Sequence, residues 1–195
     1  MEHTRETVII LDFGGKYAQM VARRVREAQV YCELLSYKTP WEEILKRKPK
    51  AIILSGGSSG MFAENAPTCD ERVFEGNVPV LGIGYGMYLM VKSLGGEVKP
   101  NTNREKGLTE LIIDANRGIF QGLERKIEVF MDAGDYLVML PKGFEVFAHT
   151  EKTSFAAVGN GKNLYGIQFH PEENSTANGR EILNNFLFRI IFRIF

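Results

Sequence analysis

The chain has few of the residues that build disulfide frameworks and metal centres. Its 195 residues include only the cysteines Cys32 and Cys69 and the histidines His3, His149 and His170. Two cysteines cannot form a disulfide framework or a four-cysteine metal site. The three histidines lack the paired spacing of metal ligands. We therefore expect no metal, no cofactor and a reducing, cytoplasmic setting.

Net charge is also absent, because 24 Lys and Arg residues balance 24 Asp and Glu residues. Such a chain has no basic field to attract a phosphate backbone or an anionic membrane surface. No stretch approaches the roughly 20 apolar residues that a membrane span needs. The most apolar segment, 186–195, contains Arg189 and Arg193 and suits an amphipathic helix. We expect partners among small molecules and proteins, not nucleic acids or membranes.

What the chain does have is the composition of a globular domain, with 44% hydrophobic and 25% charged residues. Its length suits one domain over residues 1–195. In the first half, aliphatic runs alternate with helix-period segments, which indicates parallel strands joined by crossover helices. We predict strands at 8–12, 30–35, 51–55, 78–82, 109–114, 127–131, 144–149, 155–158 and 164–169, and helices at 17–28, 41–46, 86–94 and 179–195.

These elements predict an α/β fold: an open, mostly parallel sheet flanked by helices, with a β-rich second half. Ligand chemistry in such sheets gathers at the C-terminal strand ends. One strand end carries Gly82-Ile83-Gly84-Tyr85-Gly86, and glycines around a central residue are typical of a nucleophile elbow. The central residue is Gly84, which has no side chain. Taken alone, the pentapeptide is more simply a glycine-rich turn.

The wider sequence resembles the class I glutamine amidotransferase domain, most closely the form found in GMP synthases, over nearly the whole chain. The resemblance implies the flavodoxin-like fold of that family. It rests on Leu11-Asp12-Phe13-Gly14-Gly15, Ser55-Gly56-Gly57, residues 63–67, 79–83 and 85–87, Leu94-Gly95-Gly96, Arg104-Glu105, Gly134-Asp135-Tyr136, residues 166–172, Glu181-Ile182-Leu183 and residues 185–188.

The resemblance implies a thioester reaction on glutamine. A cysteine at the elbow attacks the side-chain amide, ammonia leaves, and water releases glutamate. His170 and Glu172 match the histidine and its orienting carboxylate, and the backbone N–H groups of Gly57 and Tyr85 match the oxyanion site. The nucleophile position falls on Gly84. We therefore expect glutaminase activity to be absent or vestigial.

The residues expected around the pocket also differ from the family pattern. These differences gather at the strand ends, whereas substitutions from random decay would be scattered over the whole chain. Met61, Phe62, Tyr85 and Tyr88 would give it apolar walls. We therefore expect the space over Gly84 to take an apolar or aromatic small molecule better than glutamine. The departures are Lys16 and Tyr88 in place of glutamines, Ser58 in place of a proline, Asp132-Ala133 in place of a Ser-His pair, and Glu173 at the start of a segment where Val-Thr-His is typical.

Three interpretations stay open. The chain is an amidotransferase domain without glutaminase activity, a diverged or rebuilt enzyme, or a non-catalytic binding protein. In the second case Asp132 or His170 would act as a general base, or Lys16 would form a Schiff base. The simpler alternatives are a solvated Asp132 and an exposed Lys16, with Glu173 an ordinary surface charge. In the family, ATP and the nucleotide bind a separate synthetase portion, so we expect a synthetase partner, present either as a further domain or as its own subunit.

Overall fold

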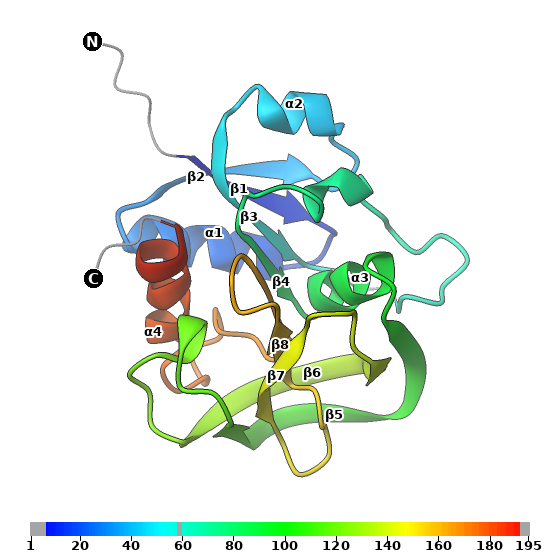
Figure 1. Ribbon diagram of the computed structural model, residues 1–195, viewed down its shortest axis with the longest axis vertical. Coiled ribbons are helices and arrows are strands. Elements are labelled where there is room, and N and C mark those ends of the chain that lie inside the picture. Colours follow the sequence, from blue (N-terminus) through cyan, green and yellow to red (C-terminus); the bar gives the residue numbers. More distant parts are fainter. Residues whose placement is uncertain (1–6, 58–59, 192–195) are drawn as a thin grey trace.

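The computed structural model describes residues 7–57 and 60–191, apart from the side chains of 101–104. One nine-stranded sheet runs through the molecule in the order β2-β1-β3-β4-β9-β8-β7-β5-β6 (Figure 1). Its strands are β1 (Thr7–Asp12), β2 (Tyr31–Ser36), β3 (Pro49–Ser55), β4 (Val80–Ile83), β5 (Glu97–Ile113), β6 (Lys126–Met139), β7 (Glu145–His149), β8 (Ala157–Gly159) and β9 (Leu164–Ile167).

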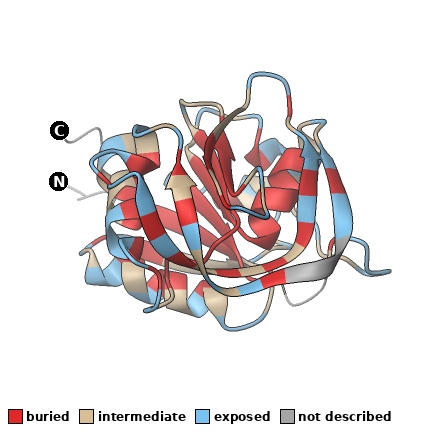
Figure 2. Ribbon diagram, turned by 90° about the horizontal axis from the view of Figure 1, so that it is seen from below, coloured by how far each residue is buried: buried red, intermediate tan, exposed pale blue. Residues whose placement is uncertain are grey.

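The first five strands in this order are parallel, and the remaining neighbours pair antiparallel. The central strands are buried on both faces (Figure 2), as parallel sheets require. The helical segments are α1 (Tyr17–Glu27), α2 (Trp41–Leu45), α3 (Tyr85–Ser93) and α4 (Gly179–Asn184), the short turns Glu71–Val73 and Gly118–Phe120, and a π-helix at Asn185–Ile191. The predicted α/β class and β-rich second half are confirmed.

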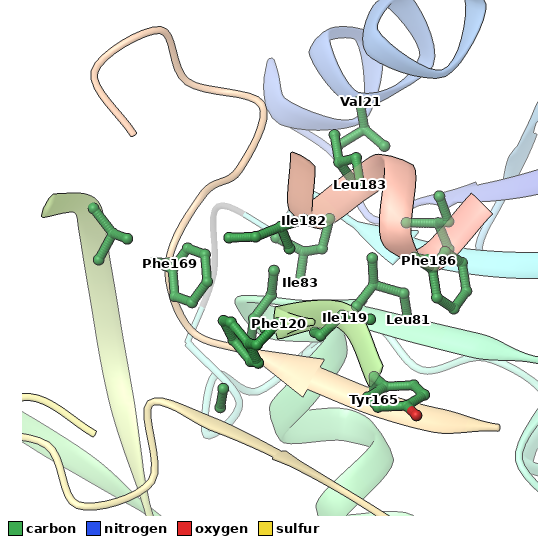
Figure 3. Packing of buried hydrophobic residues seen from close by; sticks show 14 of the residues in the cluster. Val21, Leu81, Ile83, Ile119, Phe120, Tyr165, Phe169, Ile182, Leu183 and Phe186 are labelled. Carbon is green, nitrogen blue, oxygen red and sulfur yellow. The ribbon is translucent and has the colours of Figure 1, made fainter. Parts of the chain in front are cut away.

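Two hydrophobic clusters cover the two faces of the sheet. Val8 and Ile10 of β1 belong to one cluster, and Ile9 and Leu11 to the other, because successive strand side chains point to opposite faces. Figure 3 shows the first cluster, in which Val21 of α1 lies beside Leu183 of α4. The second lies under α2 and α3. This packing fixes the strand ends that carry the site.

The long ribbon of β5 and β6 differs from the sequence prediction. We expected short strands at 109–114 and 127–131, whereas the two strands span 17 and 14 residues. Along β6, buried residues alternate with more exposed ones. Polar side chains therefore interrupt the apolar residues, and a prediction based on continuous hydrophobic runs finds only part of the strand. Met131 of β6 also forms an antiparallel bridge to Phe169, which follows β9.

The C-terminal segment also differs in detail. The helix expected over 179–195 is an α-helix only to Asn184 and continues as a π-helix to Ile191, and residues 192–195 lie outside the described part. Among the described residues, no helix is long and apolar enough to cross a membrane.

Candidate functional site

A cavity of about 270 Å³ lies at the C-terminal ends of the parallel strands. Glycines of the loops after β1, β3 and β4 line it, together with His170 from the segment after β9. The ribbon strand β6 supplies Asp132, Gly134 and Asp135. The structure thus places a cavity at the strand ends, where the sequence predicted ligand chemistry.

The elbow between β4 and α3 has Gly84 at its centre, with φ 56° and ψ −112°. The flanking glycines permit close packing, since a Cβ on Gly86 would lie 2.6 Å from the Cβ of Leu54. Among the described residues other than its chain neighbours, a Cβ on Gly84 would meet the imidazole of His170 alone, at 3.6 Å from Cε1 and 3.8 Å from Nε2. The elbow therefore presents position 84 directly to His170.

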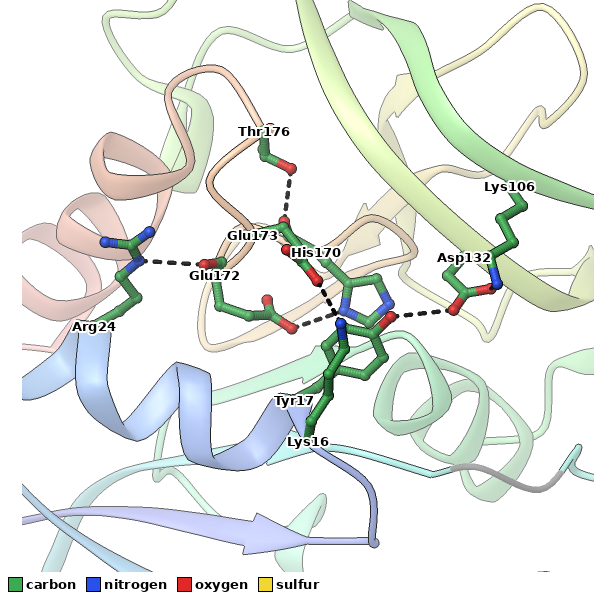
Figure 4. Close-up of polar contacts among 9 residues, drawn as sticks. All are labelled: Lys16, Tyr17, Arg24, Lys106, Asp132, His170, Glu172, Glu173 and Thr176. Atoms are coloured by element: carbon green, nitrogen blue, oxygen red, sulfur yellow. Dashed lines mark hydrogen bonds and ion pairs between the residues drawn. The ribbon is translucent and has the colours of Figure 1, made fainter.

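His170 is held by a buried carboxylate. Its Nδ1 lies 2.7 Å from Oε1 of Glu172, and the two residues are 5% and 1% exposed (Figure 4). The backbone is fixed as well, because the Thr176 hydroxyl donates to the His170 carbonyl at 2.7 Å. With Nδ1–H donated to the carboxylate, Nε2 of the neutral ring is an acceptor. The structure thus brings His170, Glu172 and Gly84 together.

The two backbone groups expected to bind an oxyanion are adjacent but not equivalent. A Cβ on Gly57 would lie 2.6 Å from the Tyr85 ring, so the two residues touch. The Gly57 N–H donates to the Gly14 carbonyl at 2.9 Å. The Tyr85 N–H is the first of α3, where a helix offers no internal acceptor. Only Tyr85 can serve without a rearrangement.

Tyr17 is a site residue that the sequence reasoning missed. Its ring stacks on the His170 imidazole, with centroids 3.9 Å apart and planes at 21°. Its hydroxyl donates to Oδ2 of Asp132 at 3.1 Å, and the Lys106 ammonium lies 3.9 Å from Oδ1 (Figure 4). Burial, together with the negative charge of Asp132, raises the pKa of Tyr17 to about 12. Its position at the helix start after a strand-end loop was the available signal.

Lys16 and Glu173 form an ion pair at the rim. The Lys16 ammonium lies 3.2 Å from Oε1 of Glu173, and the lysine side chain is 68% exposed. Schiff-base chemistry needs an amine whose charge is destabilised by burial. An exposed ammonium beside a carboxylate fits the simpler alternative, a surface lysine.

Of the expected wall residues, Tyr85 and Tyr88 line the cavity. The Tyr88 hydroxyl donates to the Asp135 carbonyl at 2.8 Å. The cavity lining does not include Met61, Phe62 or Ala133. Met61 is buried in the second cluster, Phe62 is 51% exposed, and Ala133 packs in the first cluster because it points away from Asp132 across the strand. Ser58 lies outside the described residues.

No group of three or more His, Cys, Asp or Glu side chains within the described ranges could hold a metal ion. The cavity lining offers the imidazole of His170, the carboxylates of Asp132 and Asp135, and three tyrosine phenols. The amine of Lys16 lies at the rim.

Comparison with known proteins identifies relatives along almost the whole chain. The GMP synthase [glutamine-hydrolyzing] of Caldanaerobacter subterraneus subsp. tengcongensis is 50% identical over 187 residues, which are 95% of this chain and 36% of that protein. The protein of the same name from Carboxydothermus hydrogenoformans is 49% identical over 184 residues, 94% of this chain and 36% of that protein. The chain thus spans about a third of these curated relatives.

Solved structures share the fold. The crystal structure of a candidate GMP synthase subunit, from Thermoplasma acidophilum, superposes with a TM-score of 0.85 at 25% identity, covering 95% of this chain and 94% of that one. A glutamine amidotransferase from Thermotoga maritima gives 0.78 at 19% identity, covering 97% and 99%. The profile of glutamine amidotransferase class-I matches residues 9–190. The chain belongs to the class I glutamine amidotransferase family.

Proposed function

We propose that this chain is a glutamine amidotransferase domain of the GMP synthase type that does not hydrolyse glutamine. The observation that carries this proposal is the elbow, where Gly84 has no side chain. A Cβ at this position would lie 3.6–3.8 Å from Cε1 and Nε2 of His170. The relatives named GMP synthase support the type of domain. In comparable hydrolases, loss of the nucleophile lowers turnover by about a million-fold.

The two cysteines of the chain do not replace the missing nucleophile. Cys32 lies in the first hydrophobic cluster, and burial raises the pKa of its thiol. Burial raises the pKa of the Cys69 thiol to about 12. Neither residue lines the cavity. Because the thiolate is the attacking species, raised pKa values leave both thiols mostly protonated at neutral pH and weaken them as nucleophiles.

The partner we propose is an ATP-dependent synthetase portion, in the same polypeptide or in a separate subunit. The relatives support this proposal, because they are nearly three times as long as the matched segment. A synthetase joined to a domain that produces no ammonia would draw free ammonia from solution. Its reaction would then depend on added ammonium and not on added glutamine.

The test measures glutamate release from glutamine by the wild-type chain and by Gly84→Cys. We expect no release above background from the wild type. We expect at most partial recovery in the variant, because Asp132 and Tyr88 stand where the family has other residues. Turnover by the wild type that persists through repurification and is absent in His170→Gln would overturn the proposal.

A second role is favoured by the phenol rings around the cavity. Tyr17, Tyr85 and Tyr88 all line it, and aromatic walls bind apolar ligands by burying their surface. We propose that the cavity prefers a small aromatic molecule to glutamine. A ligand that binds the native state raises the melting temperature. A rise with millimolar phenol, and none with glutamine, would support this preference, whereas no rise with phenol would refute it.

A further inference from the structure

The His170–Glu172 pair has an acceptor atom that the proposed function leaves unused. Nδ1 is held by the buried carboxylate at 2.7 Å, so Nε2 is the basic nitrogen of the neutral ring. Nε2 lies 3.8 Å from where a Cβ on Gly84 would stand. Glycine places no atom there, and an oxygen hydrogen-bonded to nitrogen needs about 2.9 Å. Water at Nε2 therefore has room.

A carbonyl group near this water would lie close to the partial positive charge at the N-terminus of α3. Gly84 directly precedes α3, and the N-terminus of a helix carries partial positive charge and unpaired N–H groups. The N–H of Tyr85 is the nearest of these along the chain. Such donors stabilise the oxyanion that forms when a carbonyl is attacked.

The cavity restricts which acyl compounds would fit. Its volume of about 270 Å³ suits a short acyl group with one ring. The rings of Tyr85 and Tyr88 line it, as do the carboxylates of Asp132 and Asp135. Aromatic walls favour an aryl leaving group, and the carboxylates oppose an anionic acyl group.

We propose that this site hydrolyses short, uncharged aryl esters by direct attack of water, without an acyl-enzyme intermediate, with His170 as general base. Water forms a bond to the carbonyl carbon while its proton passes to Nε2, and collapse of the oxyanion breaks the bond to the aryl oxygen. The aryl oxide leaves and takes up that proton, directly or through solvent. The inference rests on the proposed function in one respect: no side chain at position 84 attacks.

The experiment follows p-nitrophenyl acetate hydrolysis by the full chain and by His170→Gln. A positioned general base contributes about 10²–10⁴-fold, so we expect kcat/KM to fall by about 100-fold in the variant. Equal rates in the two proteins would overturn the proposal.

The chain offers a matched control in a second histidine and carboxylate pair. His149 Nδ1 lies 2.7 Å from Oδ2 of Asp114, the same separation, but His149 is outside the cavity lining and about one-third exposed. His149→Gln should leave the rate unchanged. An equal loss in both histidine variants would mean nonspecific imidazole catalysis and would refute the proposal.

Two further measurements keep the outcome decisive. If His170→Gln fails to melt cooperatively, Gly84→Ala replaces it, because a methyl group there would lie 3.6 Å from Cε1 and take the place of the water. Mass spectrometry during turnover should detect no acetylated protein, and a stoichiometric acetyl adduct that turns over would contradict direct attack by water. Glutamate release from glutamine would instead defeat the proposed function, so the two failures are distinct.

Discussion

The ionisation of Tyr17 is set by its immediate neighbours. Its ring is stacked on His170, its hydroxyl donates to Asp132, and its pKa is raised to about 12 by burial and by the Asp132 charge. We expect Asp132→Asn to bring the Tyr17 titration back toward 10, because the amide keeps an acceptor but removes the charge. Absorbance at 295 nm against pH measures this, and Tyr17→Phe identifies the signal. Identical titrations in wild type and Asp132→Asn would contradict it.

The same shift affects stability at high pH. The folded state holds the Tyr17 phenol neutral to about pH 12, whereas in the unfolded chain it ionises near pH 10. Its contribution is therefore fully present below pH 10 and is lost as the pH rises from 10 to 12. In chemical denaturation across this range, Tyr17→Phe should show a shallower loss of stability than the wild type. A parallel loss in both proteins would show that Tyr17 does not contribute.

A thiol introduced at the elbow tests the geometry of His170 directly. In Gly84→Cys, we expect the new thiol to react with iodoacetamide at neutral pH faster than Cys32 or Cys69, whose thiols have raised pKa values. The reason is the imidazole within 4 Å of the new Cβ, since a nearby histidine favours the thiolate. Peptide mapping by mass spectrometry assigns the sites. The variant Gly84→Cys/His170→Gln should lose the enhanced reaction.

Which side chains reach the cavity was only partly predictable from the sequence. His170, Glu172 and Gly84 were predicted together from the resemblance to the amidotransferase family. Ala133 was expected at the pocket but packs in the core. The sequence does not reveal the register of β6, and a register shift of one residue moves each side chain to the opposite face of the sheet. The helix-start position of Tyr17 placed it near the strand ends, but its stacking on His170 joins residues far apart in the chain, which local sequence patterns do not predict.

At the scale of elements, the approach of α3 to β3 depends on Gly86. A Cβ there would lie 2.6 Å from both the Cβ and the carbonyl oxygen of Leu54, so Gly86→Ala must displace the helix. Overpacking of this kind costs about 1–3 kcal/mol. We expect a loss of that size in urea denaturation, with disturbance of the elbow.

The matched control is Gly76→Ala, since a Cβ on Gly76 would meet only ordinary contacts at 3.8–4.0 Å. Surface substitutions of this type change stability by about 0.5 kcal/mol or less. Equal stability of the two variants would show that α3 can shift without loss.

The strands differed in how well the sequence predicted them. Among the parallel strands, β1, β3 and β4 are buried runs followed closely by glycines, so their positions were predicted within a few residues. The ribbon of β5 and β6 alternates buried and exposed residues and includes Pro100 and Gly107. Those residues disfavour strands locally, and pairing between the two strands overrides the local preference.

At the scale of the whole molecule, residues 1–195 were predicted to form one domain. The continuous sheet supports one cooperative unit, because each cluster draws on strands from both halves of the chain. We expect Trp41, which packs against the second cluster, to report the same unfolding midpoint in fluorescence as far-UV circular dichroism reports for the whole chain. Midpoints that separate would divide the chain into two units.

The backbone of the elbow has a consequence for the direction in which this chain can change. At φ 56° and ψ −112°, a residue with a side chain is strained by about 1–3 kcal/mol, whereas glycine adopts such angles readily. Relative to a cysteine, Gly84 therefore stabilises the fold while it abolishes the nucleophile. A change from glycine to cysteine would give up folding free energy to gain a thiol, so selection for stability alone would retain the glycine.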